Sequence, residues 1–557
     1  MRKIILSGLL LAGTLGIYAQ ENKDLMTWYH KDFATTKVYG VNTQGAYHFL
    51  ESKGLQPKTV VVGVLDSGVE IDHPGLMGNM WKNPNEIPNN GKDDDNNGYV
   101  DDIYGWNFIG GKNGDVDGDT LEVTRIVKKY KPIFEGENSA TNKANQAKMA
   151  DEFKMYMEAK NIFDKKSASA RLQYAGIQPI IEAIPVMVKL LNGKNFNQET
   201  LKGIQPAAQE EALALKIMSN FLAEPSMVNK TPEEFKKAVE EEIGEYGKYI
   251  ATQATQHYNL DFDPRPIVGD NYEDYSERFY GNNSYEGPDA EHGTHVAGII
   301  AGLPQGENPQ YGVAYKVAKI MTVRTVPNGD ERDKDVANAI RYAVDNGAKI
   351  LNMSFGKAFS PGKKYVWDAY KYAERKGVLL VHAAGNDNKD IEKNSNFPTA
   401  FYKPSDAKPF VTNLITVGAS TKDTEKLRAG FSNYNAKMVD VFAPGNEIYS
   451  PVPDGKYKYL QGTSMAAPVV AGAAAVLLSY MPSLTPAQII ESLVNTVNKS
   501  SVNANIKKDA TLTFEQVSRA GGVIDVKKAA EYAYNNFYGK SSVKKVKKAR
   551  KIRKVNR

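Results

Sequence analysis

The sequence predicts an α/β fold of three layers, in which helices cover both faces of a mostly parallel β-sheet. Two observations indicate this class. Short, nearly uncharged apolar runs recur along the chain, and helical patterns separate most of them. Such alternation is typical of parallel sheets, whose strands are buried on both faces. The composition, 41% apolar and 24% charged, is that of a globular protein.

The strands are predicted from apolar runs that are too short for helices. The first run, Thr59–Leu65, reads TVVVGVL and fits a strand buried on both faces. Five similar runs follow it: Lys319–Val323, Lys349–Met353, Val378–His382, Leu414–Val417 and Val439–Phe442. Helical periodicity over Asp335–Asn346 and Val366–Lys376 predicts two of the intervening helices.

The stretch 121–270 interrupts this alternation and is predicted to be an α-helical insertion. It is rich in Ala, Lys, Glu and Met. Apolar residues recur there at helical spacing in three segments: Met149–Lys165, Ser169–Leu191 and Pro206–Leu222. Thr231–Glu234, TPEE, matches a capping box with proline at the first helical position. The remaining segments, 20–120 and 271–538, are then one discontinuous α/β domain.

The N-terminus has the pattern of a secretory signal peptide, residues 1–19. Arg2 and Lys3 precede an apolar stretch, Ile4–Ile17, and Ala19 stands at the exit. We therefore expect export, to the periplasm, the cell surface or the medium. No stop-transfer pattern follows, so no transmembrane segment is predicted in the mature chain.

Two further features narrow the class of protein. The chain has no cysteine, which excludes disulfides, thiolate metal sites and a cysteine nucleophile. The tail 539–557 is basic, with nine Lys or Arg and no acid after residue 540. It lacks aromatic residues for base stacking, so no nucleic-acid partner is expected. The apolar segment Met465–Tyr480 is rich in small residues and is predicted to be a buried helix rather than a membrane span.

Three short motifs carry the residues of a catalytic triad. They are VLDSG with Asp66, HGTHVAG with His292, and GTSMAAP with Ser464. Nucleophilic catalysis needs a hydroxyl group, a base that accepts its proton, and a group that orients the base. Asp66 also ends the first predicted strand, and sites in α/β sheets lie at the carboxyl ends of strands.

In this order, the motifs resemble those of the subtilases, the subtilisin-like serine proteases of peptidase family S8. The chain is similar to exported bacterial members that carry a long helical insertion between the Asp and His motifs. The resemblance covers about residues 25–120 and 280–535 and implies a subtilisin-like fold. It implies that Asp66 orients His292, that His292 is general base and then general acid, and that Ser464 is the nucleophile of a serine endopeptidase forming an acyl-enzyme.

The same resemblance implies an oxyanion hole and a substrate groove. Asn386 closes an AAGN motif and would donate, with the backbone N–H of Ser464, to the oxyanion. Two short segments would form the walls against which an extended protein or peptide substrate pairs as an added strand. They are Ser354-Phe355-Gly356 and Ala383-Ala384-Gly385. The sequence assigns no residue to the floor of the first specificity pocket.

The loop DDDNNGYVDD is predicted to hold a structural calcium ion. Its polar positions match the first nine places of a calcium-binding loop, with Gly98 at the sixth. Tyr104, instead of Glu, at the twelfth place excludes an EF-hand. The predicted ligands are Asp93, Asp95, Asn97, the carbonyl of Tyr99, and Asp101. The alternative is a solvated acidic turn, and the triad chemistry needs no metal or cofactor.

Two other functions compete with an active serine endopeptidase. One is a catalytically inactive, protease-like binding or adhesion protein, which the complete set of Asp66, His292, Ser464 and Asn386 disfavours. The other is an acid peptidase of the sedolisin type, which resembles subtilases around the serine but has Glu in place of the histidine. His292 and Asn386 disfavour this second alternative.

Overall fold

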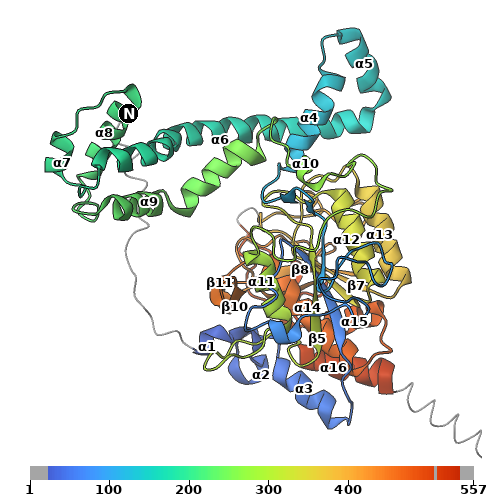
Figure 1. Ribbon diagram of the computed structural model, residues 1–557. Coiled ribbons are helices and arrows are strands. Elements are labelled where there is room, and N and C mark those ends of the chain that lie inside the picture. The colour runs from blue at the N-terminus through green and yellow to red at the C-terminus, as the bar shows by residue number, and fades with distance from the viewer. Residues whose placement is uncertain (1–22, 507–510, 540–557) are drawn as a thin grey trace, which may run out of the picture. The chain divides into compact units, whose positions relative to one another are not determined.

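The computed structural model in Figure 1 describes residues 23–506 and 511–539. The described chain divides into two compact units. The α/β unit contains the residues up to Asp115, Ile267–Val326 and those from Glu331 onward. The helical unit contains Val116–Pro266 and Pro327–Asp330. The predicted signal peptide, 1–19, and all but the first residue of the predicted basic tail, 539–557, lie outside the described residues.

A nine-stranded sheet forms the centre of the α/β unit, with strand order β12-β13-β9-β8-β7-β6-β1-β5-β2. All neighbouring strands are parallel except β12 and β13. All six strands expected from the apolar runs are present, within two residues at their starts and three at their ends. The strands are β1 (Val60–Asp66), β2 (Gly105–Asn107), β5 (Ala318–Arg324), β6 (Ile350–Met353), β7 (Leu379–Ala383), β8 (Leu414–Ser420), β9 (Val441–Pro444), β12 (Asn498–Lys499) and β13 (Gly522–Val523).

Helices pack on both faces of this sheet, so the predicted three-layer architecture is confirmed. Val60, Val62 and Val64 of β1 face the layer that contains α3 (Thr43–Ser52), α11 (Glu291–Ala301), α14 (Thr463–Tyr480) and α16 (Val526–Ala533). The opposite layer contains α12 (Asp333–Asp345) and α13 (Lys363–Arg375). Gly63 of β1 faces α12, where an added Cβ would lie 3.4 Å from Ala343. Successive residues of β1 thus face opposite layers of helices.

Several smaller elements of the α/β unit were not predicted, because they are short or interrupted by proline. The longest helix among them is α15, with nine residues, and the longest strands form the antiparallel hairpin of β10 and β11, in which Pro451 breaks the apolar pattern. The elements are α1 (Lys23–Met26), η1 (Trp28–His30), α2 (Phe33–Thr36), η2 (Met77–Asn79), β3 (Gly110–Gly111), β4 (Gly114–Asp115), β10 (Ile448–Val452), β11 (Lys456–Leu460), α15 (Pro486–Val494), η4 (Phe514–Gln516) and η5 (Tyr534–Tyr538). Helix α10 (Arg265–Val268) spans the boundary between the segments of the two units.

The helical unit is built around α6, a helix of 42 residues that is about 63 Å long. The sequence pattern predicted two separate helical segments here. They form one continuous helix, because no helix-breaking residue stands between them. The capping box of Thr231 and Glu234 is confirmed, with both reciprocal hydrogen bonds and Pro232 at the first helical position. The helices are α4 (Glu122–Phe134), α5 (Ser139–Lys148), α6 (Ala150–Leu191), α7 (Gln198–Lys202), α8 (Gln209–Phe221), α9 (Pro232–Thr252) and η3 (Gln253–His257).

The helical unit has its own apolar core and one segment that the sequence did not place there. Met187, Leu191 and Phe235 belong to a buried cluster formed by α6–α9 and their connections. The segment Pro327–Asp330 joins this unit through Asn328, whose N–H donates to the carbonyl of Asp117 at 2.8 Å. This pairing links residues more than 200 positions apart in the chain, which helical periodicity cannot reveal.

Two helices of the described chain, α6 and α14, are long and apolar enough to cross a membrane by length and composition alone. This is weak evidence, because core helices of other proteins pass the same test. The apolar window of α14 is 89% buried, as expected for Met465–Tyr480, and that of α6 is 22% buried.

Candidate active site

Asp66 and His292 are hydrogen-bonded at the carboxyl end of β1. His292 Nδ1 lies 2.7 Å from Asp66 Oδ1, and the Asp66 side chain is 2% exposed. The backbone N–H of Ser67 donates to the same oxygen at 2.8 Å. The carbonyl of Asp66 accepts the N–H groups of Thr325 and Val326, at 2.9 and 3.2 Å. The acid is therefore fixed through both its side chain and its backbone.

A glycine allows His292 to approach this acid. His292 lies in the first turn of α11 and is followed by Gly293. A Cβ on Gly293 would lie 2.0 Å from the carbonyl oxygen of Gly68 and 3.2 Å from Asp66 Cβ. Any side chain at position 293 would push the helix away from the turn after β1. The lack of space for a side chain thus explains the glycine that follows His292 in the motif.

His292 differs from the buried histidines in its electrostatic surroundings. Burial opposes the charged imidazolium, but the Asp66 carboxylate outweighs it and raises the pKa of His292 above its usual value. Burial lowers the pKa of His30 and His295 to about 3 and that of His382 to about 4. Those three rings bond to backbone carbonyls, as is typical of histidines with a structural role. His292 alone of these four is paired with a carboxylate.

Ser464 is the second residue of α14, and hydrogen bonds to the end of β6 fix its position. Gly462, with φ of 154°, makes the sharp turn that precedes the helix. Ser354 Oγ donates to the Ser464 carbonyl at 2.8 Å and accepts Asn352 Nδ2 at 2.9 Å. Ser464 Oγ donates to the Ser354 carbonyl at 3.1 Å, and within the described residues it makes no hydrogen bond to His292.

Thr463, the residue before Ser464 in α14, orients the amide of Asn386. Its Oδ1 accepts both the backbone N–H and the hydroxyl of Thr463, each at 2.9 Å. Its Nδ2 is then free to donate in another direction. A Cβ built on Gly462 would lie 3.4 Å from Asn386 Nδ2 and 3.5 Å from the backbone N of Ser464. Two N–H donors therefore lie close to one point beside Ser464.

The segment Ser354-Phe355-Gly356 has the features of an open sheet edge. His382 Nε2 donates to the Phe355 carbonyl at 2.9 Å and fixes this segment to the end of β7. Gly356 is exposed, and its N–H and carbonyl make no hydrogen bond to any described residue. A peptide in extended conformation can pair with such free groups.

Asn396, which the sequence did not assign, lies between the two expected walls. Its Nδ2 donates to the carbonyl of Ala383 at 3.2 Å. A Cβ on Gly356 would lie 2.7 Å from Asn396 Oδ1, and a Cβ on Gly385 would lie 3.3 Å from Asn396 Cγ. The closeness of this amide thus requires the glycine at position 356. At position 385, the φ of 97° and Asn433 Nδ2, 2.4 Å from a built Cβ, already require a glycine.

Comparison with known proteins now identifies the family. The family model of the subtilases, peptidase family S8, matches residues 57–539, which is most of the chain. The chain belongs to the subtilase family. The match extends across the triad motifs, the Asn386 motif and the helical insertion.

The curated relatives include subtilases of several bacteria. The cell wall-associated protease of Bacillus subtilis (strain 168) is 33% identical over 286 residues, which cover 51% of this chain and 29% of that protein. Thermitase of Thermoactinomyces vulgaris is 38% identical over 38% of this chain and 68% of its own length. Subtilisin DY of Bacillus licheniformis is 34% identical over 39% of this chain and 74% of its own length. The chain thus spans less than a third of the first relative.

In this subtilase, the five residues predicted to bind calcium share one loop but not one group of side chains. Asp93 and Asp101 each accept backbone N–H groups at both carboxylate oxygens. Among the described residues, Asp95 converges with two other carboxylates, those of Glu86 and Asp102. The loop pattern missed both partners because Glu86 precedes the loop and Asp102 stands at a position that the pattern does not use.

Asn97 and Tyr99 occupy the same loop in supporting positions. Asn97 Nδ2 donates to Asp95 Oδ2 at 3.3 Å and to Asp102 Oδ2 at 3.1 Å. Asn97 Oδ1 accepts the N–H of Tyr99 at 2.8 Å, and the Tyr99 hydroxyl donates to the carbonyl of Arg278. Both residues stabilise the loop conformation that brings Asp95 and Asp102 together.

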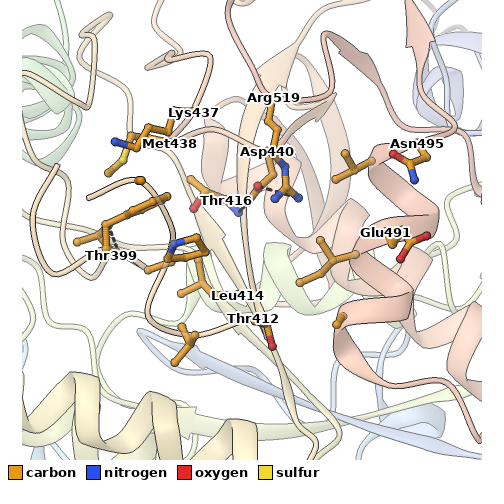
Figure 2. A pocket seen from close by; sticks show the side chains of 18 residues that line it. Thr399, Thr412, Leu414, Thr416, Lys437, Met438, Asp440, Glu491, Asn495 and Arg519 are labelled. Atoms are coloured by element: carbon orange, nitrogen blue, oxygen red, sulfur yellow. Dashed lines mark hydrogen bonds and ion pairs between the residues drawn. The ribbon is translucent and has the colours of Figure 1, made fainter. Parts of the chain in front are cut away.

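A cavity of about 740 Å³ lies apart from the triad residues of this subtilase. Figure 2 shows its lining, with the ion pair of Asp440 and Arg519 beside Thr416 of β8 and Glu491 of α15. None of its 18 lining residues is a serine or a histidine. The cavity therefore lacks the groups that acyl transfer needs.

Proposed function

We propose that this chain is an exported serine endopeptidase that cleaves extended protein or peptide substrates. The observation that carries the proposal is the 2.7 Å hydrogen bond between His292 Nδ1 and the buried Asp66. A carboxylate in this position holds the imidazole in the tautomer that leaves Nε2 free to accept a proton. Ser464 at the start of α14 and the oriented amide of Asn386 supply the remaining groups.

The proposed reaction proceeds through an acyl-enzyme. Ser464 Oγ leaves the Ser354 carbonyl, transfers its proton to His292 Nε2 and attacks the substrate carbonyl. Asn386 Nδ2 and the backbone N–H of Ser464 then stabilise the oxyanion, helped by the positive end of the α14 dipole. His292 donates its proton to the leaving amine. In the second half, His292 activates a water molecule that hydrolyses the ester and restores the Ser464 hydroxyl.

The proposed substrate groove selects the residue before the cut by size. Gly356 pairs with the substrate backbone, while Ala383-Ala384-Gly385 forms the other wall. Asn396 forms the floor, since its amide touches both walls. An amide in this position shortens the pocket and makes its end polar. Small or polar side chains are therefore the preferred residues before the cut.

Export is proposed from the sequence of residues 1–19 and from the kinds of relatives. The relatives include a cell wall-associated protease and an extracellular serine proteinase of Thermus sp. (strain Rt41A). Expression in a bacterial host is expected to give an exported protein whose N-terminal residue, by mass spectrometry of the N-terminal peptide, is Gln20 or the pyroglutamate formed from it. An exported protein that still carries Met1 would contradict the proposed signal peptide.

The decisive test of the chemistry is the Ser464→Ala variant. It removes only the nucleophile, so casein hydrolysis is expected to fall to background while circular dichroism and the melting temperature stay unchanged. Ser219→Ala, on an exposed face of α8, is the matched control and keeps parental activity. If Ser464→Ala hydrolysed casein at the parental rate, the proposed nucleophile would be wrong. If the parent itself were inactive, the protein would be a protease-like binding protein instead.

A further inference from the structure

The cavity of about 740 Å³ lies at the amino ends of β8 and β9. Leu414, the first residue of β8, lines it, and so does Asp440, which directly precedes β9. Both strands run parallel to β1, whose last residue is Asp66, so the cavity lies at the edge of the sheet opposite to Asp66. A site in this cavity is therefore separate from the proposed peptidase chemistry and does not depend on it.

Most of the cavity wall is apolar. Ten of its 18 lining residues are apolar. Phe401 and Val411 come from the loop before β8, Met438 comes from the segment before β9, and Ile490 comes from α15, and all four are buried. The volume is many times the roughly 30 Å³ of a water molecule and falls within the roughly 300–1,000 Å³ of small-molecule sites. The cavity thus has room for a ligand with an apolar body.

Four charged residues also line the cavity, and their charges cancel. They are Lys437, Arg519, Asp440 and Glu491. In Figure 2, the pair of Asp440 and Arg519 stands between Lys437 on one side and Glu491 on the other. The ammonium group of Lys437 is already bound, because it lies 3.2 Å from Glu392 Oε1 and donates to the carbonyl of Pro404.

Arg519 is the lining cation that has unused hydrogen-bond donors. Its Nη2 lies 3.1 Å from Asp440 Oδ1, and its side chain is 45% exposed. Its Nε and Nη1 make no hydrogen bond to a described residue. A guanidinium group presents five N–H donors in a planar fork that matches a carboxylate. These donors are available to an anionic group of a ligand in the cavity.

Hydrogen bonds fix the pair of Asp440 and Arg519 to the sheet. The Arg519 N–H donates to the carbonyl of Val439 at 2.7 Å, and the Ala520 N–H donates to that of Asp440 at 2.9 Å. Asp440 Oδ2 accepts the N–H of Thr416 in β8 at 2.7 Å. Burial raises the pKa of Asp440, and the charge of Arg519 opposes this rise. The segment that carries the guanidinium is thus ordered before a ligand arrives, which lowers the entropic cost of binding.

We propose that this cavity binds an amphipathic monocarboxylate, a ligand with one carboxylate and an apolar body. The carboxylate accepts charge-assisted hydrogen bonds from Arg519, and the apolar body contacts Phe401, Met438 and Ile490. A dianion such as a phosphate monoester is disfavoured, because the cancelling charges of the lining cannot offset a second negative charge. Two sources share the chemistry of the ligand: an aliphatic acid, and a short apolar peptide with a free C-terminus.

Octanoate and acetyl-Leu-Phe are suitable probes, and octanamide and the amide of acetyl-Leu-Phe are their uncharged counterparts. Calorimetric titration uses the full chain in a Ser464→Ala background, which limits self-digestion. At least one acid is expected to bind at least tenfold more tightly than its amide, because only the acid forms a charged pair with Arg519. Tighter binding of octanoate would assign the site to aliphatic acids, and tighter binding of acetyl-Leu-Phe would assign it to peptides.

Two variants test the two halves of the site separately. Arg519→Gln keeps a polar side chain but removes the charge, so the affinities for acid and amide are expected to agree within twofold. Arg171→Gln removes the same charge from an exposed position of α6 outside the cavity and is expected to keep the tenfold preference. Ala487→Phe, at an exposed lining position of α15, fills apolar volume and leaves Arg519 in place. It is expected to weaken the binding of acid and amide alike, by at least tenfold.

Several outcomes would overturn the proposal. One is the absence of saturable binding for both acids, and another is equal affinity of the parent for each acid and its amide. A third is a tenfold preference for the acid that persists in Arg519→Gln, and a fourth is parental affinity in Ala487→Phe. Should Arg519→Gln fail to fold because Asp440 loses its counter-charge, the acid-to-amide ratio of the parent and the response of Ala487→Phe provide the same decision.

Discussion

Asp66 and the group of Glu86, Asp95 and Asp102 are two acidic sites of one α/β unit with opposite surroundings. Asp66 lies at the end of a strand and is paired with the imidazole of His292, whose pKa it raises. The three loop carboxylates have neutral donors only. The first carboxylate therefore has a partner that can carry the opposite charge, whereas the three loop carboxylates have no cationic side-chain partner among the described residues. The hydrogen-bond and ion-pair partners of a carboxylate thus indicate its role better than the number of acidic residues around it.

The largest expected effect that separates the two sites comes from Asp66→Asn. The variant keeps an oxygen near His292 but removes the charge, so kcat is expected to fall by about 10⁴-fold, as in another triad protease. The melting temperature is expected to stay close to that of the parent. Loss of both activity and thermal stability would show that Asp66 also has a structural role.

The pH dependence of kcat/KM is a further test of the role of Asp66. In the parent, Asp66 raises the pKa of His292, so kcat/KM is expected to decline as pH falls through a value above 6.5. A protonated imidazole cannot accept the serine proton. In Asp66→Asn, burial is no longer opposed by the carboxylate, so the acidic limb is expected to move to lower pH. An acidic limb that moves to higher pH in Asp66→Asn, or that does not move, would contradict this electrostatic account.

A smaller effect is expected from Asn386→Ala. Loss of one oxyanion donor is expected to lower kcat by about 10²–10³-fold with KM nearly unchanged, which is the loss measured when subtilisin itself loses this asparagine. The acidic limb of the pH profile is expected to stay in place, unlike that of Asp66→Asn. A change in KM alone would indicate that Asn386 binds substrate rather than the transition state.

The smallest expected effect concerns specificity. Asn396→Gly removes the amide between the two groove walls, so kcat/KM for a substrate with Phe before the cut is expected to rise about tenfold relative to one with Ala. Asn396→Asp keeps the size of the side chain and is the matched control, without a shift toward Phe. An unchanged ratio in Asn396→Gly would remove this residue from the floor of the pocket.

The sheet and the pairing of Asp66 with His292 could be predicted from the sequence because their signals are local. Thr59–Leu65 is apolar on both faces, and Asp66 follows it directly. The parallel sheet then brings the ends of β1, β6 and β7 to the same edge, near the starts of α11 and α14. The proximity of motifs that stand at the ends of helices and strands can therefore be predicted from the sequence alone.

The position of Asn396 and the group of three carboxylates could not be predicted, because their residues meet through loops. Asn396 reaches Gly356 and Gly385 only after the chain has turned back from β7. Glu86 and Asp102 converge with Asp95 through hydrogen bonds among side chains and loop N–H groups, which have no periodic signature. The segment Pro327–Asp330 joins the helical unit in the same way, through contacts between distant parts of the chain.

The central claim is that Ser464 is activated by the pair of His292 and Asp66. It is tested most directly by reaction with a fluorophosphonate probe, followed by mass spectrometry of the digested protein. The account predicts one adduct, on Ser464, that forms in the parent and is strongly reduced in His292→Ala. An adduct on a different serine, or equal labelling of parent and His292→Ala, would contradict it.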